Sequence, residues 1–413
     1  MQHTYGMAVS TLLILLSVVT LVGGPVLITE WPREVARWYQ AAADEAELNQ
    51  EYVVAEQHLS RAIAWNDTEP RFHAQRARLK LETGEWDSGL KDCERARELG
   101  LDTTELVYTR SQLLMRVGRH EAAIAELTEL LQESKWLTTE ARAELVNSLA
   151  YAHAVGKHDL QEGLRLANEA LDVSGTRIGI LDPLGYLQFH RGYTLFAQDK
   201  PAMAAKSLNK AVQSAQTKYR RAVDRLKVLD ELPPRQQGRK EDYREQASLL
   251  KSHLAGILSL RADVWDALEQ PGAAKKTRKK IDQLAPEGNL AMAEPSDFMD
   301  AVRRLQDTSN KLDTRGFLHY QRGHLNAARR DMHDATTMID AICSTFSWQK
   351  EAMKYRMVDM RRLMASHNAT LQGKAVMYYH QMLVHQALGM DQAAEKDRNQ
   401  VVQLGYEPTP RLF

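Results

Sequence analysis

Three segments of the sequence repeat one another: residues 50–59 read QEYVVAEQHL, residues 84–93 read GEWDSGLKDC and residues 118–127 read GRHEAAIAEL. Each segment begins 34 residues after the previous one. Small residues occupy the sixth position of each, namely Ala55, Gly89 and Ala123. A fixed period of this length is typical of stacked helix pairs. The stretch from Tyr39 to Leu131 therefore predicts an array of helical hairpins.

Glycines open the second and third segments, and a ring follows each two residues later: Gly84 with Trp86, and Gly118 with His120. An aliphatic or sulfur-containing residue ends the three segments, namely Leu59, Cys93 and Leu127. The pattern resembles the tetratricopeptide repeat (TPR), whose marks are a small residue on the first helix, a glycine at the turn, an aromatic residue two positions later and an alanine on the second helix. The resemblance implies an all-α fold, a right-handed solenoid of helix hairpins that binds other proteins, but it names no partner. Gln50 replaces the turn glycine in the first segment, as a terminal repeat tolerates.

Composition indicates a folded chain of 413 residues, with 44% hydrophobic and 26% charged residues. The net charge is zero, but the front is acidic, because residues 34–67 hold seven acids against Arg37 and Arg61, and residues 275–280 are strongly basic. The two cysteines, Cys93 and Cys343, are too few for a disulfide framework or a metal pair. Both are predicted to be small core residues.

The first 31 residues predict an N-terminal transmembrane helix, which would make the protein a single-pass membrane protein. No charged residue occurs between Thr4 and Thr29, and residues 7–28 are apolar enough to contact and span a hydrocarbon core of about 30 Å. The alternative is a cleaved secretory signal, which the absence of Lys or Arg before the apolar run and the position of Pro25 after Gly23-Gly24 disfavour. The side of the membrane that carries the body stays open.

Three regular repeats are expected over residues 32–135, starting at Pro32, which suits the first turn of a helix. Trp31 and Trp38 fall where aromatic residues would contact a membrane interface, although Trp38 also suits the core of the first repeat. The small residues at position six should be buried where the helices of a hairpin meet, and each glycine should end the first helix.

The remaining two thirds predict a doubled unit with longer helices. Residues 181–192 match residues 312–323 at six of twelve positions, and residues 267–287 match residues 387–407. We expect divergent units at 140–287 and 295–408, with a hinge at 287–296.

Each divergent unit should contain long helices. In the first unit, helices over 201–229 and 242–268 would form an arm near residues 213–262, joined by an exposed turn at 231–238. In the second unit, a long helical stretch over 327–367 would be followed by a break at Asn368-Ala369-Thr370 and a helix up to Leu388.

Motifs for catalysis, cofactors or metals are not found. Gly156-Lys157-His158 lacks the remainder of a phosphate loop, and His120-Glu121 lacks the second histidine of a zinc protease motif. The pairs His319/His324 and His380/His385 are five residues apart, which does not place them on one helical face. We therefore expect no enzyme activity, no cofactor and no metal. An unrecognised site in the duplicated half, as in an enzyme or accessory subunit, is the alternative.

Basic clusters offer a further alternative, electrostatic binding of nucleic acid or anionic lipid. One cluster comprises Lys218, Arg220, Arg221, Arg225 and Lys227, and the other spans residues 275–280. No aromatic residues that could stack on bases are interleaved with them, so nucleic acid is not expected, and a solvated helix face is the simpler interpretation.

The resemblance also assigns the partner-binding groove, because family members bind partners with the first helix of each repeat, on the concave side. Counting these positions onto this chain predicts Gln40, Asp44, Arg71, Ala74, Arg78, Glu105, Tyr108 and Gln112. This set lacks the lysines and asparagines with which some members bind a terminal carboxylate. The sequence thus predicts a membrane-anchored scaffold that binds other proteins by peptide or helix docking.

Overall fold

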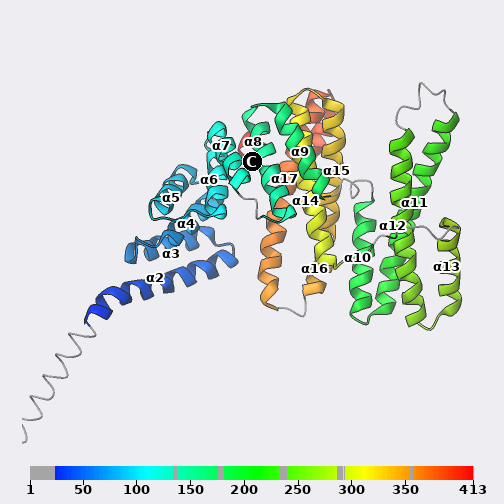
Figure 1. Ribbon diagram of the computed structural model, residues 1–413, viewed down its shortest axis with the longest axis horizontal. Helices are drawn as coiled ribbons and strands as arrows, with labels where there is room; N and C mark the ends of the chain where they lie inside the picture. The colour runs from blue at the N-terminus through cyan, green and yellow to red at the C-terminus, as the bar shows by residue number, and fades with distance from the viewer. Residues whose placement is uncertain are drawn as a thin grey trace, which may run out of the picture. The chain divides into compact units, whose positions relative to one another are not determined.

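The computed structural model describes residues 24–133, 137–174, 181–231, 240–285, 292, 294–353 and 357–412, and Figure 1 shows their helices. No strand occurs in these ranges. The chain divides into two compact units, residues 1–136 and 137–413. The all-α prediction is confirmed for the described part of the chain.

The first unit contains three helical hairpins. Its helices are α2 (Gly24–Leu48), α3 (Tyr52–Trp65), α4 (Pro70–Thr83), α5 (Trp86–Glu98), α6 (Thr104–Arg116) and α7 (His120–Glu133). Helices pack in consecutive pairs, and each hairpin also packs on the next through α3 with α4 and α5 with α6. This is the stacking that the 34-residue period predicts.

Small residues allow the two helices of each hairpin to approach closely. Ala55 and Ala123 are fully buried, and a Cβ atom added to Gly89 would lie 3.3 Å from the Cβ of Lys80 on α4, the other helix of its hairpin. Gly84 and Gly118 end α4 and α6 in the left-handed conformation, with φ of 85° and 78°. These predictions are confirmed.

The start of the first unit differs from the prediction at Pro32. Helix α2 begins at Gly24 and contains Pro32 in its interior, so Pro32 is not in the first turn of a helix. Residues 7–23 of the predicted membrane span lie outside the described residues. Within the described ranges, the structure contains no helix with the length and hydrophobicity that crossing a bilayer requires. Trp38 is 64% exposed and therefore does not belong to the core.

In its described residues, the second unit forms five longer or irregular hairpins and one short helix, α16. Its helices are α8 (Thr139–Gly156), α9 (Leu160–Ser174), α10 (Pro183–Ala197), α11 (Pro201–Glu231), α12 (Lys240–Ala267), α13 (Pro271–Leu284), α14 (Phe298–Gln321), α15 (Leu325–Ser344), α16 (Phe346–Met353), α17 (Met357–Ala387) and α18 (Asp391–Gln403), followed by a 3₁₀ turn, η4 (Pro410–Leu412). The two long helices predicted near residues 201–268 are confirmed as α11 and α12, which are visible as the tallest pair in Figure 1. Their distal halves pack through Ala222, Ala247 and Leu250. The predicted turn at 231–238 lies outside the described residues, apart from Glu231.

The prediction for residues 327–388 is wrong in two places. The first helix ends at Ser344, before a break at Thr345, and does not continue to His367. The predicted break at Asn368-Ala369-Thr370 lies inside α17. Thr370 is 3% exposed, and its hydroxyl donates a hydrogen bond to the carbonyl of Ser366 at 2.7 Å. Threonine also favours turns, but here its hydroxyl is satisfied by the backbone of the preceding helical turn, so the helix continues.

The proposed duplication has structural support at its closing end. Ala267 and Ala387 both end a helix, and the turns that follow contain left-handed residues at equivalent positions, Glu269 and Gly389. The opening matches differ, because Gly192 lies inside α10 whereas Gly323 ends α14. The duplication therefore stays a prediction. The predicted hinge lies mostly outside the described residues.

One hairpin register extends through both units. A left-handed residue stands at the turn of seven described hairpins, namely Gln50, Gly84, Gly118, Asp199, Glu269, Gly323 and Gly389. Five residues later each second helix has a buried small residue, namely Ala55, Gly89, Ala123, Ala204, Ala274, Ala328 and Ala394. The hairpin of α8 and α9 departs from this pattern, with its turn at Lys157 and Asp159. The divergent second unit thus retains the packing of the regular repeats.

Polar pairs use the same register. In five hairpins, the residue eight positions before the left-handed turn residue forms a hydrogen bond with the residue eight positions after it. These pairs are Arg76–Asp92, Arg191–Ser207, Arg261–Thr277, Arg315–Asp331 and Gln381–Asp397. Arg110 and Glu126 form the corresponding pair on α6 and α7. These pairs link the two helices of a hairpin beside the small-residue contact.

Candidate functional site

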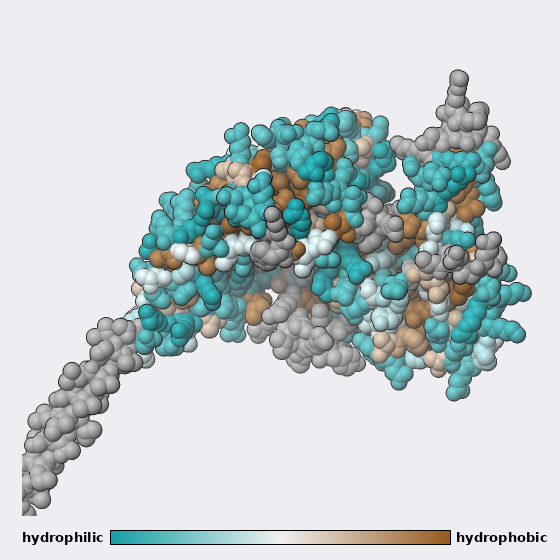
Figure 2. Space-filling view, viewed as in Figure 1, coloured by the Kyte–Doolittle hydropathy of each residue, from teal (hydrophilic) through white to brown (hydrophobic). Residues whose placement is uncertain are grey.

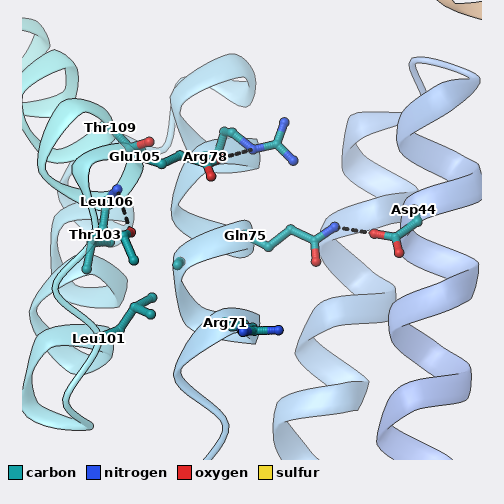
Figure 3. Close-up of a pocket in the computed structure, with 10 residues that line it drawn as sticks. Asp44, Arg71, Gln75, Arg78, Leu101, Thr103, Glu105, Leu106 and Thr109 are labelled. Atoms are coloured by element: carbon teal, nitrogen blue, oxygen red, sulfur yellow. Dashed lines mark hydrogen bonds and ion pairs between the residues drawn. The ribbon is translucent and has the colours of Figure 1, made fainter. Parts of the chain in front are cut away.

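A groove in the first unit crosses the first helices of its three hairpins. It has a volume of about 320 Å³, and Figure 3 shows its lining from α2, α4, α6 and the turn before α6. The lining residues are Asp44, Arg71, Ala74, Gln75, Arg78, Leu101, Thr103, Glu105, Leu106 and Thr109. Helix α4 provides the central residues, at a spacing of three to four that places them on one helical face.

Hydrogen bonds between neighbouring repeats hold the polar side chains of the groove. Gln75 donates to the carboxylate of Asp44 at 2.5 Å (Figure 3), and Arg78 forms a bidentate pair with Glu47. Nε of Arg78 also lies 3.9 Å from the carboxylate of Glu105 on α6. Burial acts to lower the pKa of Arg78, but the hydrogen bond and charge of Glu47 outweigh it and raise the pKa above its usual value. Arg78 thus links three consecutive repeats through two acids.

The groove also has an apolar part beside this polar network. Ala74, Leu101 and Leu106 contribute apolar atoms to its lining. Thr103 caps the first turn of α6 by accepting a hydrogen bond from the backbone of Leu106 at 3.3 Å. A small apolar floor with a polar rim is the usual composition of a site that binds an extended or helical peptide.

A second hollow continues from the groove, with Arg71 lining both. Its volume is about 610 Å³, and it is lined by Arg33, Arg37, Gln40, Asn66, Thr68, Glu69, Arg71 and Phe72. Arg33 and Arg37 pair with acids one turn away, at 2.9 Å from Glu30 and 2.5 Å from Glu34. Arg71 is exposed and forms no ion pair with any residue that the structure describes. It is therefore the cation of this surface most available to an anionic group.

The structure brings together most of the predicted groove residues. Asp44, Arg71, Ala74, Arg78 and Glu105 line the groove, and Gln40 lines the adjoining hollow.

Two predicted residues, Tyr108 and Gln112, line neither hollow. The third repeat contributes Leu101 and Thr103 from the turn before α6, and Glu105, Leu106 and Thr109 from α6 itself.

Counting repeat positions missed Gln75 and Glu47. Each belongs to a cross-repeat pair whose members are 31 residues apart, Asp44 with Gln75 and Glu47 with Arg78. This separation is three residues less than the 34-residue period, which is slightly less than one helical turn, and the two residues therefore lie beside each other on adjacent first helices. A search for polar residues at that separation would have found both pairs.

A buried charge cluster lies between α4 and α5. Asp92 is 5% exposed and accepts hydrogen bonds from Arg76 at 2.8 and 2.6 Å and from Lys80 at 2.9 Å. Lys80 also donates to Ser88 at 2.6 Å. The cluster joins the two helices of the central hairpin, whose first helix, α4, contributes Arg71, Ala74, Gln75 and Arg78 to the groove.

Two of the histidines that the sequence singled out, His380 and His385, lie beside buried carboxylates. His380 lies 2.9 Å from a carboxylate oxygen of Asp313, and His385 lies 2.6 Å from Asp397. These pairs join different helices and do not share a carboxylate. Among the described residues, no group of three His, Cys, Asp or Glu side chains could hold a metal ion. Cys93 is fully buried, and burial raises its pKa to about 12, whereas Cys343 is only partly buried.

Comparison with known proteins finds only low similarity in sequence and in superposed structure. No family model matches the chain. Among solved structures, YrrB, described as a TPR protein with an unusual peptide-binding site, is 11% identical over 61% of this chain and 88% of its own, with a TM-score of 0.29. A TPR protein from Parabacteroides merdae is 11% identical over 74% of this chain and 93% of its own, with a TM-score of 0.29. Yeast Tom70 is 15% identical over 90% of this chain and 76% of its own, with a TM-score of 0.27. The TPR-like description of this chain therefore rests on its own hairpin register and not on these superpositions.

Proposed function

We propose that this chain is a helical-repeat scaffold that binds a segment of another protein in the groove of its first unit. The observation that carries the proposal is the network of cross-repeat pairs around the groove. Asp44 and Arg78 are held by Gln75 and Glu47, so the surface is formed before a partner arrives. A preformed surface reduces the ordering cost of binding. The proposal assigns the chain no catalysis of its own.

The charged and apolar side chains of the groove indicate which partner segment would fit it. Arg71 is available to an acidic residue of the partner, and the Glu105 side chain, which is 79% exposed, is available to a basic one. Ala74 and Leu101 between them suit an apolar side chain. The expected partner segment therefore carries an apolar residue flanked by opposite charges.

Substitution in the groove should strongly reduce partner capture. Ala74→Arg fills the floor with a long cation, and Arg71→Glu reverses the available charge. We expect either change to reduce the amount of captured partner about tenfold or more, because a truncated or blocked central contact commonly costs about 2 kcal/mol. Quantitative mass spectrometry after affinity capture of the full chain measures this.

Lys91→Glu provides the matched control, because Lys91 is an exposed cation on α5 and lies outside both hollows. Retention of all partners by the Ala74→Arg and Arg71→Glu variants, with thermal unfolding unchanged, would exclude the groove as the binding site. Equal loss in the Lys91→Glu variant would show that net charge, and not the groove, governs capture.

Attachment to a membrane is a separate part of the proposal, and it rests on the sequence of residues 7–28. We expect the full chain to remain with membranes during alkaline carbonate washing, and a chain lacking residues 1–23 to be released. Release of the full chain would contradict the anchor without affecting the groove.

A further inference from the structure

Helix α13 carries an unusual concentration of positive charge. Between Pro271 and Leu284 it has five cations, Lys275, Lys276, Arg278, Lys279 and Lys280, against the single acid Asp282. Such a density of like charges on a short helix opposes helix formation through mutual repulsion. The protein therefore tolerates an electrostatic cost at this position.

Four of the cations lie on one face of α13, of which Lys275, Lys276 and Lys279 are exposed and Lys280 is partly buried. At 100° per residue, Lys275, Lys276, Lys279 and Lys280 fall within about 140° of one another. Ala274 and Thr277, which are buried, lie on the opposite side of the helix and pack towards α12. The surface drawn in Figure 2 where Figure 1 places α13 is mostly hydrophilic. We call these four residues the lysine face.

No acidic side chain of the described residues pairs with the lysine face. Arg278 pairs with Asp266 and lies 3.6 Å from Asp263, so α12 supplies acids to this cation. None of the four lysines forms an ion pair with a residue in the described part of the chain. The charge of the lysine face is thus directed to solvent.

The chain contains its own comparison for this helix. Helix α18 occupies the same place in the closing hairpin of the second match, with Ala394 buried as Ala274 is. Its residues at the positions of Lys275, Lys279 and Lys280 are glutamate, asparagine and glutamine, at 395, 399 and 400. Hairpin packing therefore does not require the lysines, and their presence on α13 needs another reason.

We infer that the lysine face binds an acidic helical segment of a partner protein, at a site separate from the groove of the first unit. Lys275 with Lys279, and Lys276 with Lys280, form two parallel rows with a spacing of four residues. Side chains at this spacing on a helix are about 6 Å apart, which equals the spacing of glutamates at i and i+4 on a partner helix. The two rows complement one or two rows of such glutamates.

The residue types favour this partner over other anions. Lysine presents a point charge, whereas recognition of individual phosphates commonly uses the planar fork of arginine, and the arginine of α13 is already paired. Helix α13 contains no aromatic residue for stacking on bases, and its large apolar residues, Ile281 and Leu284, pack against the core and are not free to insert between lipids.

Fluorescence anisotropy with a labelled peptide of four Glu-Ala-Ala-Ala repeats tests the inference on the full chain in detergent. We expect this peptide to bind, with affinity falling as salt increases, and its Gln-Ala-Ala-Ala counterpart not to bind. The variant Lys275→Glu, Lys279→Asn, Lys280→Gln copies α18 and should keep the fold. It should weaken binding by about tenfold, since each exposed ion pair contributes about 0.2–1 kcal/mol and the glutamate adds repulsion.

The variant Lys91→Glu, Lys396→Glu is the control, because it lowers the net charge by the same four units at exposed positions on α5 and α18. It should bind the peptide as the natural chain does. Equal binding by the α13 variant, or equal loss in the control, would overturn the inference. It would also fail if the α13 variant changed retention on phosphatidylserine vesicles but not peptide binding, because the lysine face would then meet a lipid surface. The groove proposal is independent of all these outcomes.

Discussion

Replacement of Asp92 by alanine is expected to lower the free energy of unfolding of the first unit by about 3–5 kcal/mol. Asp92 lies on α5 and is the shared acceptor for Arg76 and Lys80 of α4. The side chains of Lys80 and Asp92 are 7% and 6% exposed, so water cannot replace the lost carboxylate. Without Asp92, the charges of Arg76 and Lys80 stay in or near the core with no opposite charge beside them. Burying these unpaired charges costs more free energy than the intact ion pairs contribute to stability.

The ionisation of Asp92 supports this magnitude. Burial acts to raise the pKa of its carboxyl group, but hydrogen bonds from Arg76 and Lys80, with the ring of His73 at 3.6 Å, outweigh burial and hold the pKa well below its ordinary range. The folded carboxylate therefore stays charged at a pH where the unfolded one is protonated. Its contribution to stability is present above the unfolded pKa and is lost as the pH falls below that value.

Hydrogen exchange of backbone amides in α4 and α5, measured by mass spectrometry, reports the stability of this hairpin apart from the second unit. Glu98→Ala is the matched control. It removes an exposed acid of α5 that lies 3.0 Å from Arg95, and it should change stability by less than about 0.5 kcal/mol. Replacing Arg76, Lys80 and Asp92 together with Met, Leu and Leu should recover most of the loss. An effect of Asp92→Ala as small as that of Glu98→Ala would refute the argument.

Asp92 also shows what sequence periodicity misses. The 34-residue step predicted the hairpins of the first unit, since the small residues and the turn glycines follow directly from packing constraints. The periodicity did not predict the polar pairs between the helices of each hairpin, because an arginine or aspartate on an amphipathic helix is normally assigned to the surface. The partner of Asp92 is 16 residues earlier on an antiparallel helix, where it becomes a neighbour only after the hairpin closes.

Helix boundaries in the second unit were less predictable for a related reason. Pro201 and the charged end of α11 mark one long helix clearly. Thr370 sits in a triplet that favours a turn, yet its burial in α17 outweighs the local preference. Within the groove, repeat counting located Asp44, Arg71 and Arg78 but not the turn before α6, because loop positions do not follow helical periodicity.

Acidification from pH 7 to pH 5 is expected to destabilise the second unit through two buried histidines, His190 and His253. Nδ1 of His190, on α10, lies 3.0 Å from the backbone nitrogen and 3.1 Å from the carbonyl oxygen of Ser296, so the ring is fixed by the backbone of that residue. His253, on α12, packs edge-to-face against Phe189 with ring centroids 5.5 Å apart. The exposed fractions of the two histidines are 3% and 6%.

Burial lowers the pKa of both rings to about 4. For His190 the positive charge of Arg304 adds to the effect of burial, and the hydrogen bond with Ser296 and the charge of Asp297 oppose it. For His253 the neighbouring His190 is the further cause of the lowering. Unfolded histidine has a pKa of about 6.5. Between these values the unfolded chain takes up protons that the folded chain does not, so the free energy of unfolding falls as the pH falls through this window.

The expected loss between pH 7 and pH 5 is about 1–2 kcal/mol for each histidine, from the difference in proton binding of the two states. Urea unfolding at a series of pH values, followed by hydrogen exchange in α10 and α12, measures the slope. His190→Gln and His253→Gln should each reduce the slope by about half, whereas His333→Gln, at an exposed position of α15, should leave it unchanged. A slope that persists in the His190→Gln, His253→Gln double variant would assign the acid sensitivity to other groups. The effect is distinct from that of Asp92, because the aspartate titrates below pH 4 in the unfolded chain and lies in the first unit.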